Sequence, residues 1–481
     1  MPDSKPLVEP RTLKGMQDLL PEDAIPRRGV VSLIEGIFQK YGFVPIETPA
    51  LEHLDVLLGA GGEETNKELF RLESPEEEPI ALRFDLTVPF SRIVAEYPDR
   101  IKVPFRRYAI GPVWRADKPG PGRFRQFTQV DIDAAGSDSV AVDAEVISVM
   151  AEVMRATGVT EFAVLVSNRK LIDALLLGIG VTELPKQKHV LRIIDKLQKV
   201  GIDNIRLELG PGRIDSSGDP IPGAQLPQSV IDGVCNFVGI SGGTRLEVLE
   251  NLRQMLPTGE ISDAALAEMT LLHEALCALG VSETEVRFDP SLARGLDYYT
   301  GPVFETVLTN APQFGSVMGG GRYDGLVARF VDRAIPCTGM SVGLDRLMAA
   351  LVHLGLVMRP KTTVEALVVA LGNVPAAEIL RIATELRSAG IRTEAFFGPK
   401  RNMKTQLSHA DFYEIPVAVI VGEDEIAAGT VSVKSLIEGK MQREGIADRD
   451  AYRQAGKTGQ VSVPRSEMIS AVQTFLGQGT R

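Results

Sequence analysis

Hydrophobic and polar positions in the first third of the chain predict a helix followed by strands. Apolar residues recur at helical spacing over 30–38, and the helix is expected to end near Gly42. Residues 43–46 then predict a short strand. Residues 103–115 and 123–134 alternate between apolar and polar, and the Pro/Gly-rich segment ADKPGPG between them predicts a long hairpin.

The pattern becomes mostly helical between residues 169 and 285. Apolar residues recur at helical spacing in three stretches, 187–200, 245–256 and 263–279. Ser262 is a suitable N-cap for the third helix, and Gly280 is a suitable end. A Gly/Pro/Ser-rich loop, GPGRIDSSGDPIPGAQ, lies between the first two. We interpret this region as a helical insertion.

Strand patterns return in the last third of the chain. Residues 298–308 predict a strand, a glycine-dense loop follows, and a helix begins at Leu344. From Val364 onward strands and helices alternate, which is typical of a small α/β domain with a largely parallel sheet. The linker at 358–361 is the expected boundary of this domain.

Composition narrows the class of protein. A length of 481 residues exceeds what one core usually supports, so we expect two to four domains. The net charge of −11 argues against non-specific coating of nucleic acid, although a local basic patch can still hold RNA. Cys235, Cys277 and Cys337 form no CxxC pair, as expected in a reducing compartment. We see no secretory pattern and no apolar run of roughly 18 residues, so we expect a cytoplasmic protein with no membrane and no DNA partner.

The strand predicted over 123–134 carries the most informative side chains. Because side chains alternate between the faces of a strand, one face carries Arg125, Phe127, Gln129, Asp131 and Asp133. The opposite face carries Phe124, Val130 and Ile132 and is the expected core side. A guanidinium, a ring, an amide and two carboxylates together can bind an aromatic, phosphorylated and cationic ligand. On this strand alone, a solvated outer face is an equally good interpretation.

Other segments carry further candidate binding groups. Arg115 and Arg123 flank the hairpin loop, where guanidinium groups suit phosphate, although singly each is more often a surface ion pair. Gly319–Gly321 lack Cβ atoms and so permit either a close ligand approach or a tight turn. Tyr298 and Tyr299 point to opposite faces if extended, so that one ring would pack in the core and the other would line a pocket.

Two patterns indicate other chemistry more weakly. Residues 339–343, GMSVG, fit the GxSxG pattern of a hydrolase nucleophile at Ser341, and His353 and His409 follow, but the strand-rich run that precedes such a serine is missing. His273 and Cys277 are four residues apart on a predicted helix and can share a metal ion. Because no second pair lies nearby, a packed core pair is the better interpretation.

The motifs together resemble the histidyl-tRNA synthetases, a family of class II aminoacyl-tRNA synthetases. The resemblance rests on FRRYAIGPVWRADKPGPGRFRQFTQVDID, RGLDYYTGPVFE, GGGRYDGL and GMSVGLDRL, which occur in this order. RTLKGMQDLLPED near the start and VGEDEIAAGTVSVKSL near the end extend it over essentially the whole chain. RGLDYYTG with GGGRYDG is specific to this family and its paralogues, whereas GLDR is generic to class II.

The resemblance implies an α+β class II catalytic domain, an antiparallel sheet flanked by helices, with a mostly helical insertion and a C-terminal α/β anticodon-binding domain. The expected ranges are 1–168 and 286–358 for the two parts of the catalytic domain, 169–285 for the insertion and 364–481 for the anticodon-binding domain. The insertion would contact the acceptor arm of the tRNA. YGFVPIETPALE, with Pro49, resembles the dimer-interface motif and implies a homodimer.

The resemblance also implies roles for individual residues. Arg115 would grip the α-phosphate and the substrate carboxylate, and Arg294 would stabilise the transition state from the other side of the α-phosphate. Arg346, helped by Arg123 or Arg125, would hold the γ-phosphate, and Phe127 would stack on adenine. The histidine site would comprise Asp85, Thr87 and Gln129 at the α-amino group, Asp133 and Tyr299 at the imidazole, and Tyr298. No side chain is assigned to a metal, because Mg²⁺ would arrive with ATP.

Three departures from the common bacterial pattern of the family stand out. Asp85 stands where many bacterial members have glutamate, and Asp133 likewise replaces a longer glutamate. Ala116-Asp117 stands where they often have His-Glu. The substrate motifs therefore resemble the eukaryotic and archaeal branch.

The sequence thus predicts a histidine–tRNA ligase that forms histidyl-adenylate from histidine and ATP and transfers histidine to the 3′ end of tRNA(His). Its expected partners are L-histidine, tRNA(His) and a second copy of the chain. A non-catalytic paralogue, the regulatory subunit of ATP phosphoribosyltransferase, shares the catalytic fold but lacks the anticodon domain, so the tail at 364–481 argues against it. A domain that senses uncharged tRNA finds no support, because no kinase signature accompanies the chain.

Overall fold

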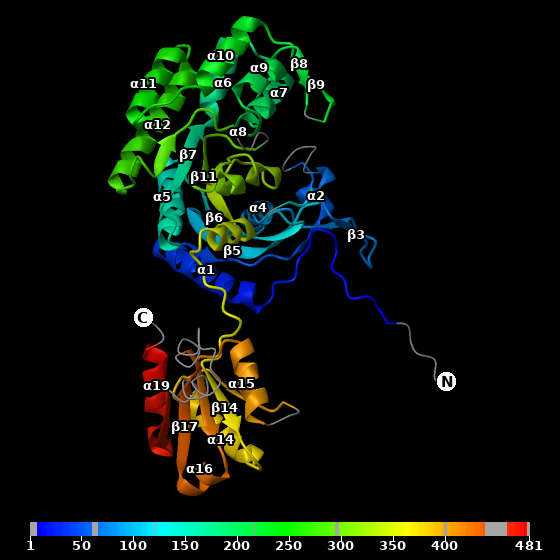
Figure 1. Ribbon diagram of the computed structural model, residues 1–481. Helices are drawn as coiled ribbons and strands as arrows, with labels where there is room; N and C mark the ends of the chain where they lie inside the picture. Colours follow the sequence, from blue (N-terminus) through cyan, green and yellow to red (C-terminus); the bar gives the residue numbers. More distant parts are fainter. Residues whose placement is uncertain are drawn as a thin grey trace. The chain divides into compact units, whose positions relative to one another are not determined.

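A computed structural model describes residues 7–59, 66–120, 122–215, 217–293, 298–398, 402–437 and 459–478. The chain divides into two compact units (Figure 1). The first comprises residues 1–18 and 30–357, and the second comprises 19–29 and 358–481. None of the described helices is long and apolar enough to cross a membrane.

An eight-stranded sheet organises the first unit, in the order β1-β5-β6-β13-β12-β11-β7-β10. Its strands are β1 (Val44–Pro45), β5 (Phe105–Trp114), β6 (Gln126–Ala135), β7 (Phe162–Asn168), β10 (Val286–Phe288), β11 (Pro302–Leu308), β12 (Ser316–Arg322) and β13 (Cys337–Gly343). All neighbours from β5 to β7 are antiparallel, and β1 and β10 join the edges in parallel. The antiparallel sheet agrees with the prediction, as does the β5–β6 hairpin.

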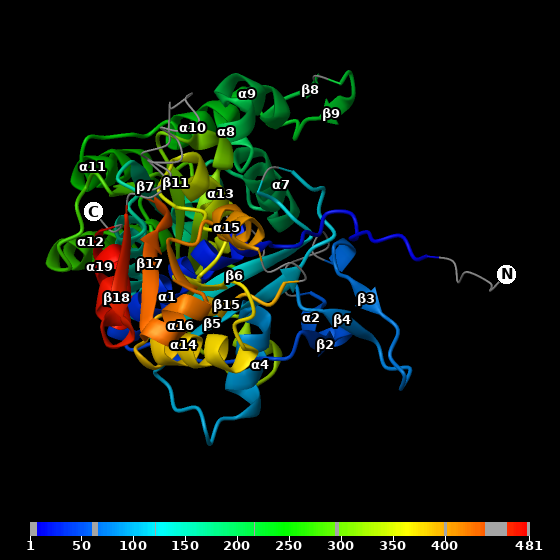
Figure 2. The same ribbon diagram turned by 60° about the horizontal axis from the view of Figure 1, so that its bottom comes forward.

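Helices cover both faces of this sheet. One face packs against α1, α5 and α13, whereas α2, α4 and a small sheet of order β2-β4-β3 lie over the other (Figure 2). The bounds are α1 (Pro21–Lys40), α2 (Leu54–Leu57), α4 (Thr87–Glu96), α5 (Val140–Ala156), α13 (Leu344–His353), β2 (Leu51–His53), β3 (Arg71–Leu72), β4 (Ile80–Leu82), and the 3₁₀ turns η1 (Pro312–Phe314) and η2 (Val327–Arg329).

The predicted helical insertion forms seven helices and one hairpin within residues 169–278. They are α6 (Arg169–Gly178), α7 (Leu184–Ile194), α8 (Leu197–Val200), α9 (Ile202–Leu209), α10 (Gln228–Val238), α11 (Arg245–Met255), α12 (Glu260–Ala278), β8 (Gly212–Ile214) and β9 (Pro220–Pro222). The helices gather at one end of the unit (Figure 1). The predicted start of α12 is wrong: the helix begins at Glu260 after Gly259, and Ser262 is buried inside it.

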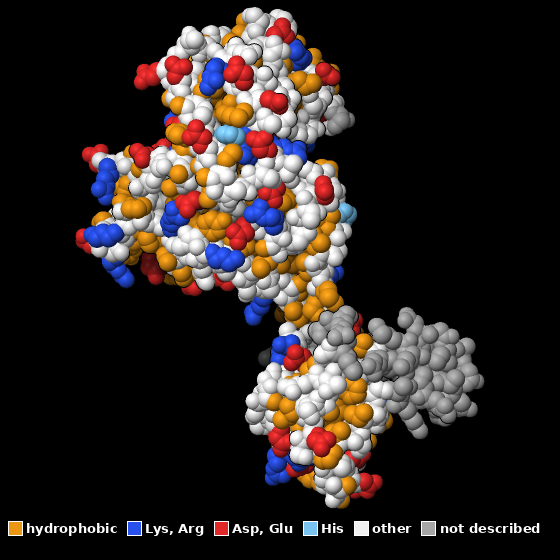
Figure 3. Space-filling view, turned by 90° about the vertical axis from the view of Figure 1, so that its left-hand side faces the viewer, with side chains coloured by type: hydrophobic (Ala, Val, Ile, Leu, Met, Phe, Trp, Pro, Cys, Tyr) orange, Lys and Arg blue, Asp and Glu red, His pale blue; other side chains and the backbone are white. Residues whose placement is uncertain are grey.

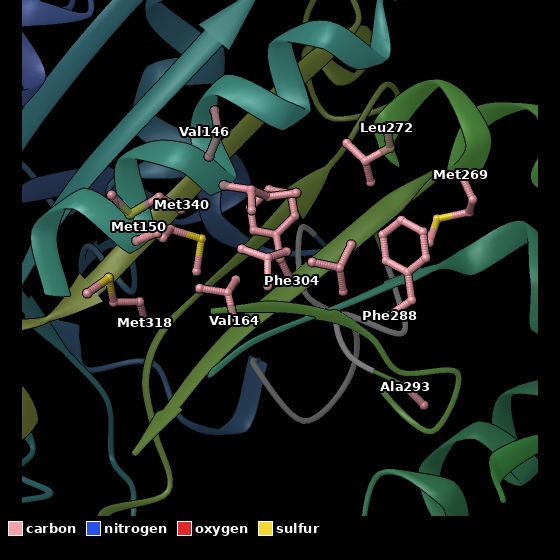
Figure 4. Packing of buried hydrophobic residues seen from close by; sticks show 14 of the residues in the cluster. Val146, Met150, Val164, Met269, Leu272, Phe288, Ala293, Phe304, Met318 and Met340 are labelled. Atoms are coloured by element: carbon pink, nitrogen blue, oxygen red, sulfur yellow. The ribbon is translucent and has the colours of Figure 1, made fainter. Parts of the chain in front are cut away.

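The insertion shares its hydrophobic core with the sheet. Met269 and Leu272 of α12 belong to the same buried cluster as Val164 of β7 and Phe304 of β11 (Figure 4). Burial of apolar surface contributes about 25 cal/mol of stability per Å² removed from water, so the shared core stabilises the insertion and the sheet together. The predicted insertion is therefore continuous in packing with the eight-stranded sheet.

The glycine run is a strand at the centre of the sheet, so the prediction of a loop or tight turn is wrong. Gly320 pairs with Phe304 on one side and with Met340 on the other. A Cβ atom on Gly320 would lie 2.1 Å from the carbonyl oxygen of Gly339 and 2.6 Å from Cε2 of Phe304. The absence of a side chain at Gly320 therefore leaves space for the Phe304 ring. The alternation of apolar and polar residues in the sequence does not predict this steric requirement.

A second sheet, of order β15-β14-β16-β17-β18, organises the second unit. Helices α14 and α19 pack on one of its faces and α15 on the other. The bounds are β14 (Ala366–Ala370), α14 (Ala376–Ser388), β15 (Thr393–Ala395), α15 (Met403–Phe412), β16 (Val417–Val421), α16 (Glu423–Ala428), β17 (Thr430–Ser435), β18 (Gln460–Pro464), η3 (Arg465–Glu467) and α19 (Met468–Gln478). The sheet is mixed and not largely parallel as predicted, because β17 and β18 add two antiparallel pairings.

We predict that Gly320→Ala destabilises the first unit by about 1–3 kcal/mol, because the added methyl group overpacks a site bounded by backbone and a buried ring. Gly325→Ala is the matched control, since an added Cβ there meets no atom within 4 Å. Urea unfolding of the two variants measures the difference. Equal stability of both would contradict the proposed steric need.

Candidate active site

A cavity of about 470 Å³ opens on the sheet face that carries Gln129 and Asp133. All the predicted site residues line it except Arg125 and Arg294. The residues concerned are Asp85, Thr87, Arg115, Arg123, Phe127, Gln129, Asp133, Tyr298, Tyr299 and Arg346. Gln129 and Asp133 are 7% and 2% exposed, so this part of the β6 face is not a solvated outer surface.

The two exceptions differ in kind. The Arg125 side chain turns back along the hairpin, where its Nε donates to the carbonyl oxygen of Asp117 at 3.1 Å. Its Cγ atom packs where a Cβ on Gly15 would lie, at 2.9 Å. Arg294 lies outside the described residues.

Three arginines reach the cavity, Arg115 and Arg123 from the β5–β6 hairpin and Arg346 from α13. The Arg115 guanidinium carbon lies 4.1 Å from the centroid of the Phe84 ring and 5.2 Å from that of Phe127, and Nε donates to the Phe84 carbonyl oxygen. Arg346, in the first turn of α13, donates to the Ser316 carbonyl oxygen at 2.5 Å. Planar cations held in this way are prepared to bind a polyanion.

Acidic side chains orient the rim of the cavity. Asp117 accepts two hydrogen bonds from Arg123, at 2.8 and 3.1 Å. Burial, followed by the neighbouring Asp117 carboxyl, raises the pKa of Glu68 to about 7. Asp345 accepts from the backbone N–H of Thr128 at 2.7 Å and so fixes the start of α13 against β6. The sequence indicated no role for any of these three acids.

The inner end of the cavity contains Asp133 and its partners. Tyr323 donates its hydroxyl proton to Oδ1 of Asp133, and Nη2 of Arg107 lies 2.5 Å from Oδ2. Burial raises the pKa of Asp133 to about 6, although Arg107 and Tyr323 both favour the carboxylate. A Cβ on Gly339 would lie 2.2 Å from Oδ1, so this glycine leaves the space that the carboxylate fills. The motif GGGRYDGL contains Tyr323, but the sequence indicates no role for it.

Next to Asp133 on the same face of β6, Asp131 is also buried, at 1% exposure. Burial raises the pKa of Asp131 to about 7, and the charge of Arg107 opposes that rise. The sequence placed this carboxylate on the correct face but gave it no role.

The start of α4 supplies two more of the predicted residues. Oδ1 of Asp85 accepts from the backbone N–H groups of Thr87 at 3.1 Å and Val88 at 2.9 Å, which satisfies donors that a helix start leaves free. The second oxygen of Asp85 is not used by these two bonds. Gln129 donates to the Ser341 hydroxyl at 2.8 Å.

The hydrolase interpretation of Ser341 is wrong in structural terms. Ser341 lies inside β13, between β6 and β12, and not on a turn between a strand and a helix. His353 bonds to Gln313, and His409 belongs to the second unit. No described histidine is therefore placed to activate this hydroxyl.

His273 and Cys277 pack around a buried cation. Nε of Arg245 donates to Nδ1 of His273 at 3.2 Å, and Nη2 lies 3.6 Å from Sγ of Cys277. In the part of the chain that the structure describes, no three His, Cys, Asp or Glu side chains gather as metal ligands would.

The two adjacent tyrosines lie together, whereas an extended backbone would send them to opposite faces. Their ring centroids are 4.4 Å apart, and Tyr298 meets Tyr323 edge-on at 6.3 Å. The expectation of opposite faces is wrong because Tyr298 lies in a turn and β11 begins only at Pro302. Gly321 leaves room for the Tyr299 ring, whose Cδ1 would be 2.9 Å from an added Cβ.

Asp195, at the C-terminal end of α7, also lines the cavity. The insertion thus contributes to the cavity wall as well as to the core. Nothing in the sequence around Asp195 indicated this, because the approach is set by tertiary packing.

Comparison with known proteins decides the family. The sequence pattern described as "Histidyl-tRNA synthetase" matches residues 15–347. The chain belongs to the histidyl-tRNA synthetase family. A second pattern, described as "Anticodon binding domain", matches residues 365–474.

Relatives of the family match over nearly the whole chain. The histidine–tRNA ligase of Caulobacter vibrioides is 39% identical over 483 residues, covering 98% of this chain and 97% of the relative. That of Rhizobium meliloti is 39% identical over 485 residues, covering 97% and 96%. The crystal structure of histidyl-tRNA synthetase from Nostoc sp. PCC 7120 has a TM-score of 0.79 at 30% identity and covers 97% of this chain and 100% of that one. The predicted family and fold class are confirmed.

The predicted affinity to the eukaryotic and archaeal branch is not supported. The relatives just named are bacterial, and the similarity to them extends over both units. Substitutions such as Asp85 and Asp133, each one methylene shorter than glutamate, change the reach of a carboxylate and do not mark a branch.

We predict that Asp131→Asn stabilises the unliganded chain more at pH 8 than at pH 5. The folded pKa of about 7 exceeds the ordinary value of 3.8, so protonation of Asp131 favours the folded state. The stability that this proton contributes is present at low pH and is lost as the pH rises through 7.

The relative gain of the variant between pH 5 and pH 8 should be on the order of 2 kcal/mol, since one pKa unit corresponds to about 1.4 kcal/mol. Urea unfolding of both proteins at the two pH values provides the measurement. Parallel pH dependence in the two proteins would show that the pKa of Asp131 is not raised.

Proposed function

We propose that the chain activates histidine with ATP to give histidyl-adenylate and pyrophosphate, and then transfers histidine to the 3′ end of tRNA(His). The observation that carries the proposal is one cavity with buried Asp133 near one end of β6 and Phe127, Arg115 and Arg123 near the other. The six residue steps from Phe127 to Asp133 span about 20 Å of strand, which suits an amino acid joined to a nucleotide.

The chemistry requires charge neutralisation more than proton transfer. The carboxylate of histidine is ionised near neutral pH, so its oxygen attacks the α-phosphorus without a general base. The P–O bond to pyrophosphate breaks as the new bond forms. Because two anions approach each other, preorganised cations lower the barrier, and in-line positioning supplies much of the remainder.

The arginines fit that requirement. Arg115, held between the Phe84 and Phe127 rings, would bind the α-phosphate and the histidine carboxylate. The Phe127 ring would stack on adenine, and Arg346 with Arg123 would hold the γ-phosphate. Arg294 keeps its predicted place opposite Arg115, on the strength of its motif alone.

The inner acids fit a cationic amino acid with two ring nitrogens. Asp85, Thr87 and Gln129 would hold the α-amino group, and Asp133 with Tyr299 would contact the imidazole. Tyr298 would complete the wall, since its ring lies against that of Tyr299. Buried polar groups reject ligands that leave them unpaired, by factors on the order of 10⁴.

Mg²⁺ is expected to enter with ATP. Sites of this kind hold Mg²⁺ through substrate phosphates and one or two carboxylates, so Asp117, with Glu68 beside it, fits such an ion. When bound, the ion offsets phosphate charge. The side chains themselves bind and orient the substrates.

The tRNA would be held by both units. The anticodon-binding pattern over 365–474 favours the ligase over the regulatory paralogue and assigns the anticodon to the second unit. The insertion would meet the acceptor arm. On the face that Figure 3 shows, basic and acidic side chains are interspersed, so local contacts would direct the tRNA there. A homodimer through the segment around Pro49 and a cytoplasmic location belong to the same proposal.

We predict that the purified chain catalyses ATP–pyrophosphate exchange with histidine and with none of the other nineteen standard amino acids. The exchange needs Mg²⁺ and no tRNA, because adenylate formation precedes transfer. Charging of total tRNA with labelled histidine is the second measurement. If the folded protein shows no exchange with any amino acid, the proposal is refuted and the non-catalytic paralogue is favoured.

Arg115→Lys should lower the rate of exchange by about 10²–10³-fold, since one preorganised charge contact is worth a few kcal/mol in such reactions. Lysine keeps the charge but loses the planar group that packs between two rings. Arg287→Lys is the control, because Arg287 is exposed on the edge strand β10. Comparable rates for the two variants would remove Arg115 from its assigned role.

A further inference from the structure

Asp131 is a buried acid for which the proposed chemistry provides no task. It lies on β6 between Gln129 and Asp133, opposite Ala109 of β5 and Ser341 of β13. Although the side chain is 1% exposed, neither carboxylate oxygen accepts a hydrogen bond from any residue that the structure describes. An unpaired buried carboxylate costs several kcal/mol, so a residue of this kind needs a reason.

The cations around Asp131 donate their hydrogen bonds to other groups, although Nε and Nη1 of Arg107 have no partner among the described residues. Arg107 of β5 binds Asp133 and donates to the Leu86 carbonyl oxygen. Arg83, which precedes α4, donates to the carbonyl oxygens of Pro112 and Thr48. Each of these guanidinium groups attracts Asp131 through space without donating to it.

The anions around Asp131 oppose a further negative charge. Asp133 faces it from the same strand and Asp85 from the start of α4, and both raise its pKa. Ser341 faces it from β13, and its hydroxyl favours the charged form of Asp131 and so lowers the pKa. Three carboxylates, Asp85, Asp131 and Asp133, therefore lie near one another; Asp85 and Asp133 line the cavity, and Asp131 lies next to Asp133 on β6 without lining it.

We propose that Asp131 couples histidine binding to the uptake of one proton, so that the complex holds an imidazolium ring balanced by a carboxylate beneath it. The proposal rests on histidine being the substrate. Asp131 acts here as a positioning residue, because Asp133 lies in the cavity wall and Asp131 lies next to it on the strand.

Proton affinities explain why the complex keeps a proton that the separate molecules lose. The pKa of Asp131 in the empty cavity is about 7, and that of a free imidazole is about 6.5. At pH 8 both groups are mostly deprotonated when apart. With the ring held at Asp133 and away from water, the nearby Asp131 charge favours one retained proton in the complex, and the number of protons is the same whichever group carries it.

A consequence for selectivity follows. A histidine isostere with a 1,2,4-triazole ring has nearly the same shape but is far less basic. The pocket should therefore bind histidine more tightly than the isostere, and the preference should depend on Asp131. A ring recognised by shape and neutral hydrogen bonds alone would show no such dependence.

Calorimetry on the full-length protein tests the proposal directly. Histidine is titrated at pH 8 in phosphate and in Tris, whose ionisation enthalpies differ, so the difference in heat counts the protons taken up. We expect close to one proton for the unmodified protein and for Asp131→Glu, and close to none for Asp131→Asn. Asp138→Asn, an exposed acid outside the cavity, is the matched control and should take up as many protons as the unmodified protein.

The outcomes separate this proposal from the proposed function. Histidine binding by the unmodified protein without proton uptake, or equal uptake by Asp131→Asn, would overturn the role of Asp131 alone. Failure to bind histidine at all would overturn both proposals.

The unmodified protein supplies an independent test should Asp131→Asn not fold. Uptake of one proton requires the dissociation constant for histidine to rise up to about tenfold per pH unit above pH 7.5, while that for the triazole isostere stays nearly constant. A dissociation constant for histidine that is flat with pH would overturn the proposal.

Discussion

The side chains of Val130 and Ile132 project from one face of the central sheet into the large hydrophobic core. Those of Gln129, Asp131 and Asp133 project from the opposite face. From Gln129 to Ala135 the strand is buried on both faces, so the polar side chains there have no bulk water to solvate them. Their charges must be met by Arg107, Tyr323, Ser341 or a ligand. This constraint shapes the closed end of the cavity and explains why the substrate side of the sheet is polar yet enclosed.

Small residues on the neighbouring strands make that enclosure possible. Gly339 stands opposite Asp133 and leaves space for its carboxylate, and Gly321 leaves space for the Tyr299 ring. Gly320, on the other face, leaves space for Phe304 in the core. The same glycine-rich strands therefore serve packing on one face and binding on the other, which couples the shape of the cavity to the stability of the sheet.

The buried charges of the site destabilise the unliganded protein relative to the complex. Burial raises the pKa values of Asp131 and Asp133, which means that the unliganded cavity holds these carboxylates at a cost. Under the proposed function, a cationic amino acid relieves that cost on entering. At the opposite end, Arg115, Arg123 and Arg346 line the cavity, as the proposed binding of phosphates requires.

Much of this organisation follows from the sequence, because it depends on local periods. The β5–β6 hairpin, the helical stretches at 187–200, 245–256 and 263–279 and the alternating second unit follow from spacings of two and 3.6, and the face shared by Phe127, Gln129 and Asp133 follows from the first of these. The family, and the residues that its motifs designate, follow from the order of those motifs.

Tertiary structure decided what depends on neighbours distant in sequence. A glycine run is a turn or a strand according to the rings beside it, and the two tyrosines meet because the chain turns before β11. The bond from Tyr323 to Asp133 joins residues 190 positions apart, and the isolation of Asp131 and the approach of Asp195 likewise depend on separate elements that meet only in the fold. Burial and charge are properties of these assembled neighbours, and no short window of the sequence contains them.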